Sequence, residues 1–199
     1  MDVQVVKYNK KNMNIKNHNA KVSGKTCSLS LMEFDKADSR EWKKLFDRWK
    51  ALKLGMRKYQ SREPNFPEGL SEVAFCLWSG SLRFISAKGC PHSSFDTFNI
   101  KTGKTEQVKA SSVEFDLTSF GPRSKWDDIY FLDFYNGGKL DGTFNVYKIP
   151  TKLVHEVKVK KTHTFLQRQA EGKRPRFSII KSFIKIGKIK PIERNVKVW

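Results

Sequence analysis

The sequence has few cysteines and no long apolar run. Its three cysteines, Cys27, Cys76 and Cys90, form no Cys-x-x-Cys pair and leave one thiol over. This usage predicts neither a structural zinc nor a disulfide framework and is typical of a reducing cytosol. No segment reaches the roughly 18 consecutive apolar residues of a membrane-spanning helix, and the N-terminus lacks the apolar core of a signal peptide. We therefore expect a cytoplasmic protein without a membrane partner.

Acidic residues are scarce relative to basic ones. Asp and Glu number 20 against 39 Lys and Arg, which gives a formal net charge of +19. The excess lies at both ends: residues 151–199 hold 14 Lys or Arg and three Glu, and residues 1–26 hold six Lys and one Asp. A basic periphery around a near-neutral centre indicates a protein that binds a polyanion such as double-stranded DNA.

The length of 199 residues suits one compact domain. Residues 1–30 are rich in Lys and Asn with little periodicity, which predicts a loose basic arm. Residues 31–150 should hold a helical N-terminal part and the core. Residues 151–199 should form a basic C-terminal segment that binds DNA.

Two helices are predicted ahead of the strands. Apolar residues recur at helical spacing over 42–52, which predicts an amphipathic helix that is capped by Asp38 or Ser39 and ends at Gly55. Its apolar stripe consists of Trp42, Leu45, Phe46, Trp49 and Leu52. A second helix, apolar almost throughout, is predicted over 70–78 and should be buried against a sheet.

The rest of the chain predicts a sheet with connecting segments. Strands are expected at 82–87, 95–100, 105–110, 129–134 and 143–149, a loop with a short helix at 117–128, and a helix at 164–170. The order of these elements predicts an α/β (or α+β) fold, in which a mixed central β-sheet is flanked by helices.

Residues 94–111 predict a β-hairpin that gathers polar side chains. A turn over 101–104 contains a glycine where a positive φ is expected. Pairing its first residue with its last sets Asp96 opposite Lys109, and Gln107 lies two residues before Lys109 on the same face. Glu106 points to the other side with Val108. The hairpin therefore places Asp96, Gln107 and Lys109 on one surface.

These three residue types suit a metal-dependent nuclease. A carboxylate, a neutral oxygen ligand and a lysine amine on one surface can hold Mg²⁺ and position a water for attack on phosphorus. A hairpin with one ordinary surface ion pair would carry the same residues.

A helix with Glu72, a strand with Asp96 and the tripeptide Gln107-Val108-Lys109 resemble the PD-(D/E)XK nuclease superfamily. The surrounding sequence is similar to that of small type II restriction endonucleases that cut short GC-rich sites of the GCNGC kind. It comprises SSFDTFNIKTGKTEQVKAS, FDLTSFGPRSKWDDIYFLDF, GTFNVYKIP and GKRPRFSIIK. Two departures are visible, since Phe95 replaces the motif proline and Gln107 replaces an acid. Glu72 is the expected compensating carboxylate, with Glu106 as the fallback.

The resemblance implies a restriction-endonuclease-like core and a mechanism. Asp96, Glu72 and Gln107 would hold Mg²⁺, Lys109 would orient the attacking water, and cleavage of double-stranded DNA would leave 5′-phosphates. A short palindromic site implies a homodimer on DNA, and a host must protect its own DNA with a methyltransferase. Arginine in a groove is the commonest guanine contact. The basic residues expected to bind DNA are Arg123, Lys125, Lys173, Arg174 and Arg176.

Two other functions fit the same residues. A structure-specific or repair endonuclease would prefer branched DNA to linear duplex. A non-catalytic DNA-binding protein would bind with a steep salt dependence and cut nothing at any metal concentration.

Overall fold

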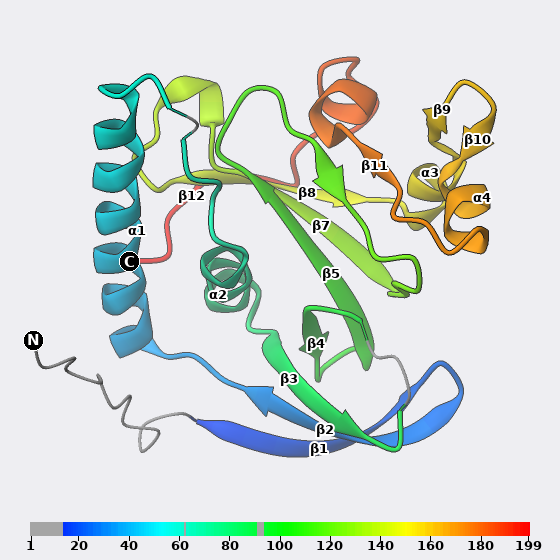
Figure 1. Cartoon of the computed structure of the whole chain (residues 1–199). Coiled ribbons are helices and arrows are strands. Elements are labelled where there is room, and N and C mark those ends of the chain that lie inside the picture. The colour runs from blue at the N-terminus through cyan, green and yellow to red at the C-terminus, as the bar shows by residue number, and fades with distance from the viewer. Residues whose placement is uncertain (1–13, 62, 91–93) are drawn as a thin grey trace, which may run out of the picture.

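A computed structural model describes residues 14–61, 63–90 and 94–199 of the chain, which form an eight-stranded sheet with helices on both faces (Figure 1). The strand order is β1-β2-β3-β4-β5-β7-β8-β12, and β5 and β7 pair in parallel between antiparallel neighbours. The sheet is therefore mixed, which confirms the predicted fold class. Its strands are β1 Ile15–Val22, β2 Lys25–Met32, β3 Leu82–Lys88, β4 Thr97–Asn99, β5 Lys104–Ser111, β7 Asp128–Asp133, β8 Phe144–Ile149 and β12 Glu193–Val196.

Helices and two small strand pairs complete the fold. The helices are α1 Lys36–Arg57, α2 Glu68–Ser79, α3 Thr151–Glu156 and α4 Phe165–Ala170, with short helical turns η2 Asn136–Gly138 and η3 Ile180–Ile184. The small pairs join β6 Thr118–Ser119 to β11 Arg176–Phe177, and β9 Lys158–Lys160 to β10 His163–Thr164. No helix in the described part of the chain is both long and apolar enough to cross a bilayer.

The two long helices cover one face of the sheet. On that face Trp42 and Phe46 of α1 and Phe75 of α2 pack with Leu132 of β7 in one buried cluster. Alternate residues of β7 point to the other face, where Phe131 packs in a second cluster with side chains of α3, α4 and η3. A strand buried on both sides explains the continuous apolar run at 129–132.

Both predicted helices begin earlier than their sequence pattern indicated. Asp35 caps α1: its side chain accepts hydrogen bonds from the backbone N–H groups of Ala37 and Asp38, and the side chain of Asp38 accepts one from the backbone N–H of Asp35. The expected cap at Asp38 is thus the third residue of a capping box. Helix α2 begins at Glu68, so its first turn carries an acid that the predicted helix omitted.

The loose basic arm predicted for residues 1–30 is wrong for residues 15–30. These residues form the β1–β2 hairpin, and β2 pairs in turn with β3. The side chains of Cys27, Leu29 and Leu31 alternate with serines and are buried, a period-two pattern that the Lys- and Asn-rich surroundings obscured. Residues 1–13 of the predicted arm lie outside the described residues.

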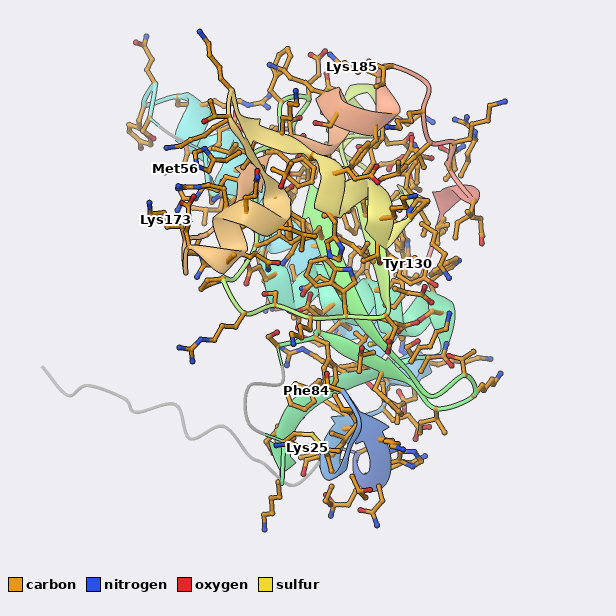
Figure 2. All side chains as sticks on the ribbon, turned by 90° about the vertical axis from the view of Figure 1, so that its right-hand side faces the viewer. Lys25, Met56, Phe84, Tyr130, Lys173 and Lys185 are labelled. Atoms are coloured by element: carbon orange, nitrogen blue, oxygen red, sulfur yellow. A yellow bond between two sulfur atoms is a disulfide. The ribbon has the colours of Figure 1, made fainter. Side chains whose placement is uncertain are left out.

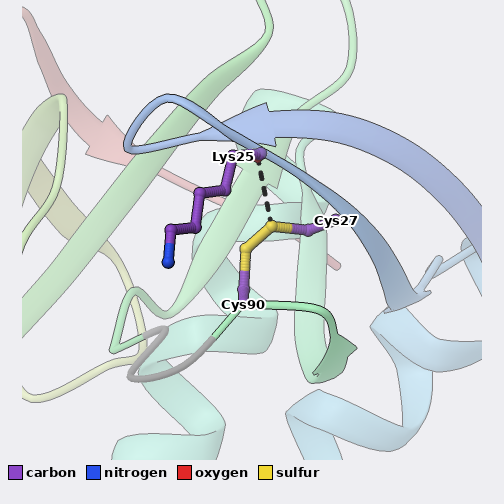
Figure 3. Close-up of a disulfide and its surroundings, with 3 residues drawn as sticks. All are labelled: Lys25, Cys27 and Cys90. Carbon is purple, nitrogen blue, oxygen red and sulfur yellow. Dashed lines mark hydrogen bonds between the residues drawn. A yellow bond between two sulfur atoms is a disulfide. The ribbon is translucent and has the colours of Figure 1, made fainter.

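Cys27 and Cys90 form a disulfide, which corrects the expectation of unpaired thiols (Figure 3). Their Cα atoms lie 5.5 Å apart although the residues are 63 positions apart. Pairing of Ser28 with Lys88 places the start of β2 beside the residues that follow β3. Cys76 is a buried free thiol.

We expect unfolded, unreduced protein to titrate one thiol with Ellman's reagent, from Cys76, and reduced protein to titrate three. Closing a loop of this length restricts the unfolded chain, so Cys27→Ser should lower the unfolding free energy by about 2 to 4 kcal/mol under oxidising conditions. Urea titrations with and without reductant measure this loss. Three free thiols in unreduced protein would contradict the disulfide.

The predicted short helix within 117–128 is also wrong. Thr118 and Ser119 form β6, which pairs with β11, and the backbone N–H of Phe120 donates to the carbonyl of Pro175 at 3.0 Å. The local sequence does not specify this pairing, because the partner strand β11 lies more than 50 residues downstream of β6. It fixes the basic C-terminal segment against the residues that follow β5.

Candidate active site

Strands β4 and β5 form the predicted hairpin in a register that differs by two residues. Asn99 pairs with Lys104 and Thr97 with Glu106, and the backbone N–H of Asp96 donates to the carbonyl of Glu106 at 2.9 Å. The side chain of Asn99 accepts hydrogen bonds from the backbone N–H groups of Lys101 and Thr102 and so stabilises a wider turn. A shift of two residues keeps every side chain on its predicted face. Asp96 therefore lies beside Gln107 instead of opposite Lys109.

Asp96 is held by the strand that carries the other motif residues. Its Oδ2 accepts a hydrogen bond from the backbone N–H of Val108 at 2.8 Å and a second one from the side-chain amide of Gln107. Because the amide nitrogen of Gln107 points to Asp96, its carbonyl oxygen remains available as a ligand atom.

Burial raises the pKa of Asp96 to about 6. The positive charge of Lys109 opposes this shift, whereas the carboxylates of Glu72 and Glu68 add to it. Lys109 also lies over the ring of Phe120, with its ammonium nitrogen 5.7 Å from the ring centroid. The site thus combines a partly buried carboxylate with a lysine held beside it by an aromatic ring.

Helix α2 contributes two acids near Asp96. Glu72 forms an ion pair with Arg83 of β3, in which Nε donates to Oε2 at 2.6 Å. Glu68 lies one turn earlier on the same helical face and lines the cleft that contains Asp96. Sequence reasoning missed Glu68 because the predicted helix began at Leu70, although its i, i+4 spacing from Glu72 was a usable signal.

Glu106 lies away from the motif residues. It is buried and accepts a hydrogen bond from Thr97 Oγ1 at 2.9 Å, which satisfies its carboxylate on the opposite side of β5 from Gln107. Its predicted orientation is confirmed. Nothing in this placement favours the fallback role as a ligand.

One cleft of about 680 Å³ brings the motif residues together with the C-terminal segment. Asp96, Gln107 and Lys109 lie along its wall with Arg174 and Arg176. Lys53 also lines the cleft; it is buried and forms an ion pair with Glu63 at 2.9 Å. Within the described residues no group of three or more His, Cys, Asp or Glu side chains is placed to hold a metal by itself.

The chain that forms this cleft is similar to known proteins over most of its length. The Bsp6I restriction endonuclease family profile matches residues 34–186 of the chain. The type II restriction enzyme Bsp6I from Bacillus sp. (strain RFL6) is 31% identical over 172 residues, which cover 83% of this chain and 94% of that protein. The chain belongs to the Bsp6I restriction endonuclease family. No solved structure matches it.

Membership in the Bsp6I family makes the chain a type II restriction endonuclease, a site-specific deoxyribonuclease. The match includes the hairpin, α2 and the arginines of the cleft. The residues described above therefore lie within the part of the chain that defines the family.

The five basic residues predicted to bind DNA lie in three different places of this Bsp6I-family fold. Arg174 and Arg176 line the cleft that contains the motif residues, whereas Arg123 and Lys125 line a separate hollow of about 700 Å³ next to Trp126. Lys173 forms an ion pair with Glu171 at 3.2 Å. Basic side chains extend to both ends of the molecule, since Lys25 lies at the opposite end from Lys185 (Figure 2).

The raised pKa of Asp96 predicts a pH-dependent cost to folding in metal-free protein. Its unfolded pKa is near 3.8, so the folded state binds this proton more tightly and loses the advantage as pH rises through about 6. Asp96→Asn should therefore be more stable than the native protein by about 3 kcal/mol at pH 8 and by less than about 1 kcal/mol at pH 4. Urea unfolding in EDTA at several pH values measures the difference. If the difference in unfolding free energy between the two proteins did not change with pH, Asp96 would not have a raised pKa in the folded protein.

Proposed function

We propose that this enzyme hydrolyses phosphodiester bonds of double-stranded DNA with Mg²⁺ at a short GC-rich site and leaves 5′-phosphates. The observation that carries the proposal is the common wall formed by Asp96, Gln107 and Lys109 in one cleft with two arginines. Carboxylate and carbonyl oxygens are hard ligands, and a magnesium site needs only one or two carboxylates beside water and phosphate oxygens.

The residues present fit such a cation. Asp96 and the carbonyl oxygen of Gln107 would hold it, and the raised pKa of Asp96 indicates a buried carboxylate that a cation would stabilise in its charged form. Bound there, Mg²⁺ would polarise a phosphate oxygen and acidify a water molecule. This is the PD-(D/E)XK type of site, with an amide in place of the second acid.

Helix α2 would supply the further carboxylate, and the two candidates have different costs. Glu72 must release Arg83 before it can bind a cation, whereas Glu68 already lines the cleft. Comparison of Glu72→Gln with Glu68→Gln at increasing Mg²⁺ distinguishes them. The variant that needs more Mg²⁺ for half-maximal cleavage identifies the ligand.

Lys109 would act on the reacting groups directly. Its ammonium group can orient the attacking water by hydrogen bonding and balance the negative charge that develops on the phosphate. Arg174 and Arg176 would hold the flanking phosphates or read guanine in the groove. Arg123 and Lys125 would extend the contact with DNA beyond the cleft.

We further propose that two copies act together on DNA and that a methyltransferase protects the host. A palindromic site presents two equivalent scissile bonds, which a two-fold symmetric pair of clefts would match. Analytical ultracentrifugation of protein with a duplex that carries the mapped site would show the stoichiometry.

The first test is digestion of linear phage DNA with Mg²⁺, beside an EDTA control. Discrete bands that vanish in EDTA and that DNA ligase rejoins would support site-specific cleavage with 5′-phosphate ends. Cleavage of branched duplex in preference to linear DNA would favour a structure-specific nuclease. Intact DNA with every divalent metal would refute catalysis.

A further inference from the structure

The segment that follows β5 has an inverted pattern of apolar and acidic residues. Val113, Phe115 and Leu117 are 41%, 62% and 69% exposed, whereas Asp116 between the last two is only 9% exposed. A solvated loop normally buries the apolar side chains and exposes the acids. All three apolar residues line the cleft that contains the motif residues.

Hydrogen bonds hold Asp116 inward and therefore the neighbouring apolar side chains outward, and a surface ion pair restrains Glu114. Asp116 accepts hydrogen bonds from Thr118 Oγ1 at 2.8 Å, from the backbone N–H groups of Ile179 and Ile180 at 2.9 and 3.1 Å, and from Ser178. Glu114 forms an ion pair with Lys185 at 2.7 Å. Turning the segment over would break these contacts and leave the buried N–H groups of Ile179 and Ile180 without acceptors. The exposure of the apolar residues is thus part of the built structure.

Cations surround this apolar ridge, which we define as Val113, Phe115 and Leu117. The ammonium groups of Lys181 and Lys185 lie 5.2 and 4.7 Å from the centroid of the Phe115 ring. Arg174 and Arg176 line the same cleft. These charges suit a polyanion, and they oppose a second copy of a chain with net charge +19.

An apolar ridge between cations has a specific use on DNA. Lysine and arginine bind phosphates without regard to sequence, whereas aliphatic and aromatic side chains cannot bind phosphates and contact base edges or insert between stacked bases. Strand β5 leads from Lys109 directly into the ridge, so the ridge has a fixed position relative to the scissile phosphate.

We propose that Phe115 and Leu117, supported by Val113, form a wedge that contacts the bases of duplex DNA in the cleft and contributes to site selection. This inference rests on the proposed nuclease function. Leu117 is the leading side chain because it is the most exposed of the three.

The test compares Phe115→Ala/Leu117→Ala with Ile192→Ala, a control that is 55% exposed and does not line the cleft. Each is placed in an Asp96→Asn background, and binding to duplexes with and without the mapped site is followed by fluorescence anisotropy over a range of salt. The double variant should lose roughly tenfold or more in preference for the site. Its salt slope and its affinity for unrelated duplex should stay unchanged, because no phosphate contact is lost. The control should match the background.

A second readout reports the bases themselves. With 2-aminopurine scanned through the site, one position should brighten on binding of the Asp96→Asn protein and stay dark with the double variant. The wedge would be refuted if the double variant kept its preference for the site. It would also be refuted if the double variant changed only the oligomeric state of the protein, which would assign the ridge to contacts between copies of the chain. If native protein neither cuts DNA nor prefers any duplex, the proposed function fails and the wedge fails with it.

Discussion

Asp96→Asn is expected to abolish DNA cleavage while leaving the protein folded and able to bind DNA. Asp96 is the one carboxylate among the three motif residues on the cleft wall, so its removal takes away the charge that would attract a cation. Asparagine keeps the shape of the side chain and can still accept the hydrogen bond from the backbone N–H of Val108. The rate of cleavage should fall by at least about 1000-fold, as is typical when a group that acts in the transition state is removed.

Single-turnover cleavage of a duplex with the mapped site, at enzyme excess, measures the loss without interference from product release. Binding of the same duplex in Ca²⁺ should be retained, because the variant removes a negative charge near the phosphates. Glu106→Gln is the matched control. It alters the neighbouring carboxylate on the opposite side of β5 and should cleave at close to the native rate. Cleavage by Asp96→Asn within tenfold of native would place the catalytic centre elsewhere.

Trp42→Ala is expected to cause the largest loss of stability in the chain. Trp42 is 1% exposed, and its ring stacks on Phe46, Phe134 and Trp199 with centroids 5.4, 6.1 and 5.6 Å away. Its Nε1 donates to the carbonyl of Leu70 at 2.8 Å. Alanine would leave a large cavity where α1, α2 and the C-terminus meet, and an unpaired carbonyl. The expected loss is about 4 to 5 kcal/mol.

A loss of this size is comparable to the whole stability of many domains. Urea unfolding followed by circular dichroism measures it. Leu45→Ala is the matched control, since Leu45 belongs to the same predicted stripe but is 41% exposed, and we expect it to change the unfolding free energy by less than about 1 kcal/mol. Equal losses in the two variants would contradict the burial of Trp42 as the cause.

The predicted stripe of α1 illustrates the limit of periodicity. Its aromatic members Trp42, Phe46 and Trp49 are buried, whereas Leu45 and Leu52 are exposed. Helical spacing identifies an apolar face but not how far the partner extends over it. Here α2 and the C-terminal Trp199 cover only the aromatic part of the face.

The predicted motif shows a similar division. The side on which Asp96, Gln107 and Lys109 lie followed from alternation along a strand, and it survived an error of two residues in the register. The turn geometry around Asn99 decided the register, and it depends on side-chain hydrogen bonds that a count of residues does not contain. Glu68 became a second candidate beside Glu72 because α2 begins at Glu68 and not at Leu70.

The sequence by itself determined the mixed fold class, the two long helices, the central strands and the grouping of the motif residues on one surface. Each of these follows from local periodicity, and short-range backbone geometry enforces it. Only the tertiary structure decided the disulfide, the β6–β11 pairing and the outward turn of Phe115 and Leu117. Those features depend on contacts between residues far apart in the chain, such as Asp116 with Ile179 and Cys27 with Cys90, which no local pattern encodes.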